Sequence, residues 1–327
     1  MRRRAVVAGI LALSLSGFAS TLPARAQDNW PNGQVIKIVV PFAPGGTYDI
    51  VARLLVQPLG QALKTSVIIE NKPGAGTNLG TEMVVRAAPD GLTLLMGGIP
   101  NAINETLYPK LNFNVRRDLV GVTLVASLPN VLVVNPNVPA KTLAEFVALN
   151  KAKPGEITFA SGGIGTSPHL CAVMFGLEIG APNTHVPYRG SAPASQDLIA
   201  GQVQAQFDSV GSAIGQIKAG TLRALAVTSA HRAELLPDVP TMAEGGVNNF
   251  VVTSWMGLLA PAATPRPIVD RIATEVDKIL ASPEIKKILA DRGYETMGGG
   301  ADQFATYLET DIALWAKVVK ASGATVN

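Results

Sequence analysis

Four glycine-rich turns hold the residues whose types and spacing could do chemistry, at residues 41–49 (PFAPGGTYD), 72–78 (KPGAGTN), 161–167 (SGGIGTS) and 188–194 (YRGSAPA). Each turn follows an expected strand and begins an expected helix. Backbone N–H groups at a helix start have no intrahelical acceptor, and glycine lets an anion approach them closely. One such start contributes about 0.3–1 kcal/mol toward a carboxylate when exposed, and up to ~2 kcal/mol when partly buried. The chemistry expected is therefore anion binding.

Several side chains near these turns are candidates for ligand contact, and each has a structural alternative. Asp208 ends a strand and could cap a turn, or accept a hydrogen bond from a ligand amino or hydroxyl group or a water. His169 could instead satisfy the loop backbone, and Tyr188 could bind a carboxylate or pack at the edge of the fold. Phe42 could wall in a ligand or belong to the core, and Asp49 is expected to cap the helix or fasten the loop. The ligand-binding residues expected are Phe42, Ala43, Gly45, Gly46, Thr47, Asn78, Ser161, Gly162, Gly165, Thr166, His169, Tyr188, Gly190 and Asp208.

Catalytic and metal-binding patterns find little support. The chain contains no Gly-x-Ser-x-Gly elbow, no Ser-x-x-Lys pair and no P-loop, and its three histidines are not at metal-ligand spacing. We therefore expect no catalytic residue, no metal and no cofactor. Cys171 is the only cysteine, so an internal disulfide is excluded, and it fits a small buried core residue. A hydrolase using Ser161 or Ser167 with His169 remains the alternative from another class.

Alternating strands and helices must position these turns. Strands are expected at 35–40, 67–69 and 92–96, with helices at 48–63 and 78–87, a βαβαβ order that implies parallel pairing. A second series follows, with strands at 157–160, 184–187, 203–207 and 222–228 and helices at 143–152, 168–177 and 194–199. Long extended segments at 121–134, broken at 128–130, and at 251–259 look like crossings between two lobes. Helices are expected at 267–280, 283–292 and 301–321. The lobes expected are 27–125 with 251–327, and 126–250, with a cleft between them.

The N-terminal sequence is typical of a secretory signal peptide. Arg2, Arg3 and Arg4 precede an apolar run, and Ala24-Arg25-Ala26 is a small-x-small cleavage site, so we expect residues 1–26 to be removed and the protein to be periplasmic. Four of the 27 Lys and Arg residues lie in that segment. The remaining chain therefore has 23 basic and 24 acidic residues, a net charge of −1. A near-neutral surface argues against nucleic acid as a partner.

Five segments together resemble a known family: PFAPGGTYD, ENKPGAGTNLG, SGGIGTSPHL, YRGSAPASQDLIAGQV and LPDVPTMAEGG. In this order and spacing they are similar to the Bug family, the extracytoplasmic solute-binding receptors of tripartite tricarboxylate transporters. The resemblance implies a two-lobed, type II periplasmic-binding-protein fold of mainly parallel sheets flanked by helices and joined by two crossing strands. It also maps the family's ligand loops onto 42–47 and 161–166, its YxG element onto Tyr188 and Gly190, and its acidic cleft residue onto Asp208.

The function expected from these features is capture without chemistry. A small organic acid (a di- or tricarboxylate, an acidic amino acid or an aromatic carboxylate) would bind in the cleft, and a monomeric receptor would deliver it to a two-component inner-membrane permease. The alternatives within the binding class are an uncharged or amide ligand, or a sensory role.

Overall fold

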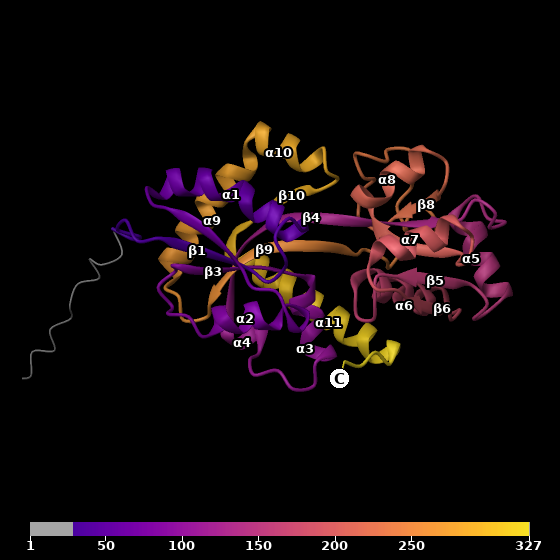
Figure 1. Ribbon diagram of the computed structural model, residues 1–327, viewed down its shortest axis with the longest axis horizontal. Coiled ribbons are helices and arrows are strands. Elements are labelled where there is room, and N and C mark those ends of the chain that lie inside the picture. Colours follow the sequence, from indigo (N-terminus) through magenta and orange to yellow (C-terminus); the bar gives the residue numbers. More distant parts are fainter. Residues whose placement is uncertain (1–28, 327) are drawn as a thin grey trace, which may run out of the picture.

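One long strand, β4 (Leu119–Val134), runs through both halves of the molecule (Figure 1). The computed structural model describes residues 29–326, so the expected signal peptide lies outside the described residues. Residues 119–129 of β4 pair antiparallel with β9 (Thr253–Pro261), and residues 130–134 pair antiparallel with β7 (Ala205–Ser209) and β8 (Arg223–Val227). The break expected at 128–130 is wrong, because Pro129 stays in the strand opposite Thr253. Its missing N–H falls where β4 changes partners from one sheet to the next.

The first sheet has the order β2-β1-β3-β9-β4, and β10 (Glu295–Gly298) pairs on the other side of β4. Its remaining strands are β1 (Ile36–Val40), β2 (Val67–Asn71) and β3 (Thr93–Gly98). Side chains alternate between the faces, so Ile36, Ile38 and Val40 pack with one core and Val39 with the other. Helices α1 (Thr47–Leu63), α9 (Arg266–Ala281) and α10 (Pro283–Ala290) cover the first face. The second carries α2 (Asn78–Val85), α3 (Ile99–Leu107), α4 (Val115–Asp118) and α11 (Gly300–Ser322).

The second sheet is built on the far half of β4, which is flanked by β8 and β7 and followed by β5 (Thr158–Ser161) and β6 (Thr184–Pro187). Its helices are α5 (Leu143–Ala152), α6 (Ser167–Ile179), α7 (Ser191–Ile199) and α8 (Val210–Lys218). Five phenylalanines form the centre of one face through ring contacts between 5.7 and 6.4 Å: Phe146, Phe159, Phe175, Phe207 and Phe250. One face of each sheet has a core confined to its own lobe, whereas the core that contains these phenylalanines continues into the first lobe.

Strand directions bring the loops of the two lobes face to face. β9 is antiparallel to both β3 and β4, so β1, β2 and β3 run in the direction of β4, toward the second lobe. β7 is antiparallel to β4 and parallel to β5, which is parallel to β6, so these three strands run toward the first lobe. The carboxyl ends of both sets of parallel strands consequently meet between the lobes, the edge at which α/β folds bind ligands.

The segments that cross between the lobes are fastened to one another at Thr228. Its hydroxyl donates to the carbonyl oxygen of Val252 at 2.5 Å and accepts the Asn130 N–H at 3.0 Å. Thr228 N–H in turn donates to the Asn130 carbonyl at 2.8 Å. The two crossing segments are thus hydrogen-bonded to each other through Thr228. The lobe boundaries expected after residues 125 and 250 stay predictions, and the exchange of sheet partners lies at 129/130.

The expected fold class is confirmed: an α/β protein of two lobes joined by two crossing strands. The sequence pattern did not indicate α3, α4, α8, β10 or the 3-10 turn at Ala75–Thr77. Among residues 29–326, no helix combines the length and the apolar run that a bilayer crossing needs.

Candidate functional site

Six helices begin at the facing strand ends, α1, α2 and α3 in the first lobe and α6, α7 and α8 in the second. The starts at Gly46, Thr77, Thr166 and Gly190 have no side chain that caps the helix. The start of α3 at Gly98 has none either, but there Asn101 accepts the Gly98 N–H. In α4, α5 and α10, by contrast, a side chain accepts a first-turn N–H. α9 and α11 also begin without a side-chain cap, so it is the location of the four starts that sets them apart. Their first-turn N–H groups are the donors that the sequence predicts for an anion, and both lobes supply them.

The first loop, residues 42–47, is held from within by Asp49. One oxygen of its carboxylate accepts the Gly45 N–H and the Arg53 Nε–H, both at 2.8 Å, and the other accepts from Asn71 Nδ2 at 2.9 Å. Asn71 Nδ2 also donates to the Phe42 carbonyl at 3.1 Å, which ties the end of β2 to the loop. The Arg53 guanidinium is the main cause that lowers the pKa of Asp49 to about 2. Asp49 therefore fastens the loop, as expected, and its charge is offset by Arg53.

The second turn rests on α3, whose role the sequence pattern did not indicate. Asn104 Nδ2 donates to the Gly76 carbonyl at 2.7 Å and to the Asn78 side-chain carbonyl at 2.9 Å. One turn earlier, the Asn101 side chain accepts the Gly98 N–H at 2.9 Å. Both asparagines are buried, so they hold the loops by hydrogen bonds from inside the lobe. The signal that could have revealed them is a proline early in a helix directly after a strand ending in two glycines.

The second lobe contributes two adjacent loops. Gly190 N–H donates to the Gly162 carbonyl at 3.1 Å, and Tyr188 N–H donates to the Ser161 carbonyl at 2.9 Å. The Thr166 hydroxyl donates to the Gly163 carbonyl at 2.7 Å, which closes the turn before α6. The residues expected from the sequence at 161–166, 188 and 190 are thus brought together.

The two lobes touch in the loop just before α6. A methyl group on Gly165 would lie 2.5 Å from Leu107 Cδ2 of α3, and Gly165 has φ +77°. Only glycine allows this approach without strain. A second contact lies at the start of α8, where a methyl group on Gly211 would be 2.6 Å from the Arg292 carbonyl. Ser254 and Ser167 also approach to 3.4 Å between their hydroxyl oxygens. The lobes are therefore in contact at three places, an arrangement that suits enclosure of a ligand between them.

Four predicted side chains have partners within the protein. Asp208 is 6% exposed at the end of β7, where it accepts the Ser209 N–H at 2.8 Å, and burial raises its pKa to about 6. The Tyr188 hydroxyl donates to Asp197 at 2.7 Å. His169 is buried, and its Nδ1 accepts the Gly165 N–H at 3.1 Å, which is the loop-backbone role considered as its alternative. Phe42 stacks on Tyr48 with ring centroids 4.1 Å apart. Ligand contact by these residues stays a prediction.

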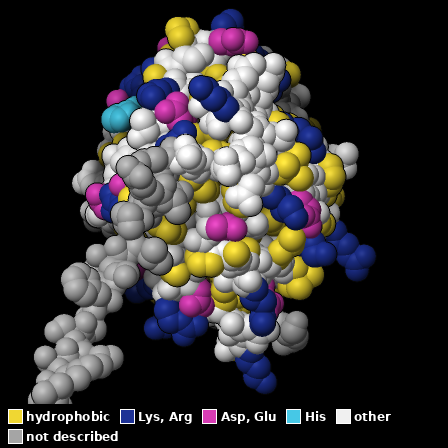
Figure 2. All heavy atoms as spheres, turned by 90° about the vertical axis from the view of Figure 1, so that its left-hand side faces the viewer, with side chains coloured by type: hydrophobic (Ala, Val, Ile, Leu, Met, Phe, Trp, Pro, Cys, Tyr) yellow, Lys and Arg dark blue, Asp and Glu magenta, His cyan; other side chains and the backbone are white. Residues whose placement is uncertain are grey.

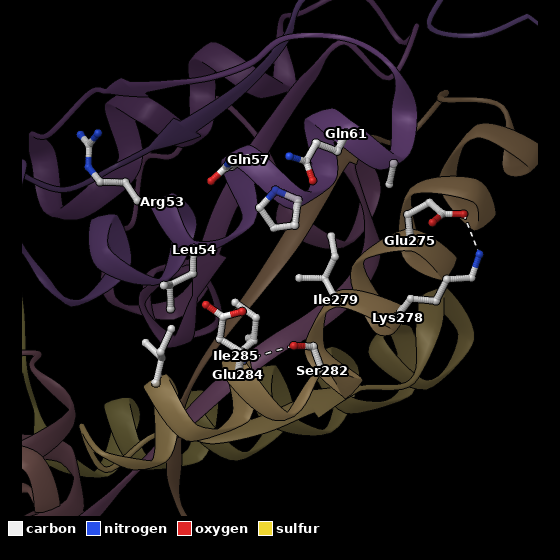
Figure 3. Close-up of a pocket in the computed structure, with 13 residues that line it drawn as sticks. Arg53, Leu54, Gln57, Gln61, Glu275, Lys278, Ile279, Ser282, Glu284 and Ile285 are labelled. Carbon is white, nitrogen blue, oxygen red and sulfur yellow. Dashed lines mark hydrogen bonds and ion pairs between the residues drawn. The ribbon is translucent and has the colours of Figure 1, made fainter.

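A cavity of about 590 Å³ lies elsewhere, between α1, α9 and α10 on the first lobe (Figure 3). Glu275 and Lys278 on its wall pair with each other at 2.8 Å. The one helix start in its lining, that of α10, is capped by Ser282 and carries Glu284 in its first turn. The Ser282 cap distinguishes this start from the four uncapped starts between the lobes, so the strand ends stay the predicted location of the anion site.

The hydrolase alternative lacks its expected geometry. The hydroxyl of Ser161 lies 2.6 Å from Nε2 of His185, not of His169, and the Ser167 hydroxyl contacts Asn130 and Ser254. Within residues 29–326, no three or more His, Cys, Asp or Glu side chains gather as metal ligands would. On the outer end of the first lobe, Lys and Arg are interspersed with Asp and Glu (Figure 2), unlike the single-signed patch of a nucleic-acid-binding surface.

Comparisons with known proteins agree with this geometry. The family model for the tripartite tricarboxylate transporter family receptor (TctC) matches residues 51–324. BugT of Bordetella pertussis is 36% identical over 329 residues, which cover 100% of this chain and 99% of BugT. A solved R. palustris protein with adipate is 33% identical with a TM-score of 0.74, over 90% of this chain and 98% of that one. MatC of Rhodopseudomonas palustris, with bound malate, is 31% identical with a TM-score of 0.70, over 87% and 98%. The expected fold and family are confirmed, and the chain belongs to the TctC family of tripartite tricarboxylate transporter receptors, the Bug-type periplasmic solute-binding proteins.

Proposed function

We propose that this receptor captures a small organic acid between its lobes and delivers it, as a monomer, to a two-component permease in the inner membrane. The observation that carries the proposal is the set of uncapped helix starts at Gly46, Thr77, Thr166 and Gly190, which face one another from the two lobes. The similar proteins with adipate and malate bind dicarboxylates, which supports an acid with a carboxylate at each end.

The carboxylates would be held by neutral donors. Helix starts and loop N–H groups supply hydrogen bonds without a countercharge, and Arg53 is already paired with Asp49. Such a site accepts different acids when a few wall residues change, because the donors belong to the backbone. Periplasmic delivery further requires export, for which the sequence at 1–26 is suited.

A thermal-shift screen against about a hundred organic acids, amino acids and their amides tests the proposal. A ligand at 100 times its Kd adds about 2.7 kcal/mol to the free energy of unfolding, a shift of a few degrees in Tm. We expect stabilisation by one class of carboxylate and none by the matching amide. Stabilisation by neutral compounds alone would show that the carboxylate chemistry is wrong, although the family is right. We expect no turnover in a chromogenic ester screen, and turnover there would support the hydrolase alternative instead.

A further inference from the structure

Two imidazole rings lie side by side behind the second-lobe loop of residues 162–166. The rings of His169, on α6, and His185, on β6, stack with centroids 3.9 Å apart and an interplanar angle of 26°. His169 is 5% exposed. Both line a cavity of about 420 Å³ between α6 and the end of α11, on which no function has been placed so far. The pair joins residues that are distant in sequence, and the sequence pattern gave no sign of it.

Each ring holds one part of the loop. Gly165 N–H donates to His169 Nδ1 at 3.1 Å, so this nitrogen must carry a lone pair and the ring's proton is on Nε2. His185 Nε2 lies 2.6 Å from the Ser161 hydroxyl oxygen, which also accepts the Gly163 N–H at 3.1 Å. The backbone of Gly163 is thus held through Ser161, and that of Gly165 is held directly.

The surroundings favour the neutral form of both rings. The cavity is lined from α6 by Val173, Gly176 and Leu177, from the following loop by residues 180–183, and from α11 by Ala321 and Ser322. No carboxylate or ammonium group is among these linings, and β5 adds the Ser161 hydroxyl. Each ring is the other's titratable neighbour, and two imidazolium ions at this spacing would repel. Burial, aided by His185, lowers the pKa of His169 to about 4, and burial also lowers the pKa of His185.

We propose that His169 and His185 are positioning residues, whose neutral rings hold the 162–166 loop in its ligand-binding conformation and release it when protonated. This inference rests on the proposed function, since the loop is taken to bind a carboxylate. Neither ring needs to touch the ligand. A protonated His169 would have no lone pair at Nδ1 for Gly165 N–H, and the loop would lose its support.

The direction of the pH effect follows from linkage. In the held loop the pKa of His169 is about 4, whereas a released, hydrated imidazole returns to about 6.5. The released state therefore binds more protons between these values, so ligand affinity is full above pH 6.5 and falls as the pH drops toward 4. Lowering the pH from 7.5 to 5 raises the ratio of released to held loop roughly 30-fold, and this factor is the upper limit for the loss of ligand affinity.

Two substitutions separate positioning from mere packing. His169→Ala removes the acceptor and should weaken binding of the identified carboxylate at least tenfold at pH 7.5. His169→Asn restores a carbonyl acceptor near Nδ1 that does not titrate, so it should recover most of that loss and flatten the fall in affinity between pH 7.5 and 5. His185→Gln is the matching variant for the contact with Ser161. Each pH profile is repeated in a D208N background, because burial raises the pKa of Asp208 to about 6 and that group titrates in the same range.

The experiment combines calorimetric titration of these variants with NMR of protein labelled with ¹⁵N-glycine, without ligand. We expect the Gly165 amide resonance to follow the His169 titration in the wild type and to lose this dependence in His169→Asn. A His169→Asn profile identical to that of the wild type, or a Gly165 amide that ignores the titration, would overturn the inference. If no carboxylate binds at pH 7.5, the proposed function fails, while the Gly165 amide still decides whether the histidines hold the loop.

Discussion

The ionised Asp208 carboxylate is expected to lower the free energy of unfolding of the ligand-free protein at neutral pH. Asp208→Asn should therefore be more stable than the wild type at that pH. The carboxylate is 6% exposed, and the contacts that stabilise its charge are the Ser209 N–H at 2.8 Å and a long contact from the Ser195 hydroxyl at 3.4 Å. Burial outweighs both contacts and raises the pKa from 3.8 to about 6. A shift of about two units corresponds to roughly 3 kcal/mol of destabilisation of the ionised form. Asparagine keeps an acceptor for the Ser209 N–H without the buried charge.

The raised pKa of Asp208 also determines the pH range in which the variant is more stable. A carboxyl group with a raised folded-state pKa binds more protons in the folded than in the unfolded state between about pH 4 and 6, so stability falls as pH rises through that range. The advantage of Asp208→Asn should therefore be fully present above about pH 6 and vanish near pH 4. For a chain of this length, a gain of 1–3 kcal/mol raises Tm by roughly 2–5 °C.

Thermal and urea unfolding of wild type and Asp208→Asn between pH 4 and 8 measure the difference directly. Asp238→Asn, at an exposed position, is the matched control and should show no pH-dependent gain. If Asp208→Asn is less stable than the wild type at pH 7.5, the carboxylate is not strained by burial and the reasoning is refuted. A gain in stability together with weaker ligand binding would indicate a site kept strained for function.

Three further predictions concern the loops and the single thiol. Gly165→Ala should weaken ligand binding at least tenfold in calorimetry, because the added methyl group meets Leu107. Adding Leu107→Ala to the same chain should recover part of this loss. Gly180→Ala is the control and should leave affinity unchanged, because Gly180 has a similar φ of +65° but open space around it. Asp49→Ala should lower carboxylate affinity about tenfold through loss of the 42–47 loop anchor, and unchanged affinity would remove that loop from the site. Burial raises the pKa of Cys171 to about 12, so a thiol reagent at pH 8 should label it only after unfolding in guanidinium, and rapid labelling of the native protein would contradict its burial.

Regular hydrophobic patterns made much of the fold predictable. The β-branched run at β1 and the core spacing of α11 identify these elements because burial alone decides their pattern. α3 was missed because its asparagines, Asn101 and Asn104, are buried for tertiary hydrogen bonds instead of being exposed. β10 was missed because its four residues, ETMG, contain no apolar or β-branched run.

The candidate site was predictable only in its loops. Glycine-rich turns can be recognised from their composition, and the direction of the strands then places them at the carboxyl edge of each sheet. The partners that hold the turns are distant in sequence: Asn71 reaches the 42–47 loop, and His185 lies 24 residues from Ser161. Such pairings depend on the packing of separate elements, which local sequence does not encode. The bond from Gly165 to His169 is local by contrast, since it joins residues four apart, and the sequence analysis named this loop-backbone role as the alternative to ligand contact.

A crystal structure of the protein with the carboxylate found in the screen tests most directly how this receptor holds its ligand. We expect the carboxylate oxygens to accept N–H groups from the helix starts at Gly46 and Thr166, one from each lobe, with the ligand enclosed between them. A ligand held by a cluster of Lys or Arg side chains, or seated in the cavity between α1 and α9, would contradict binding by neutral backbone donors.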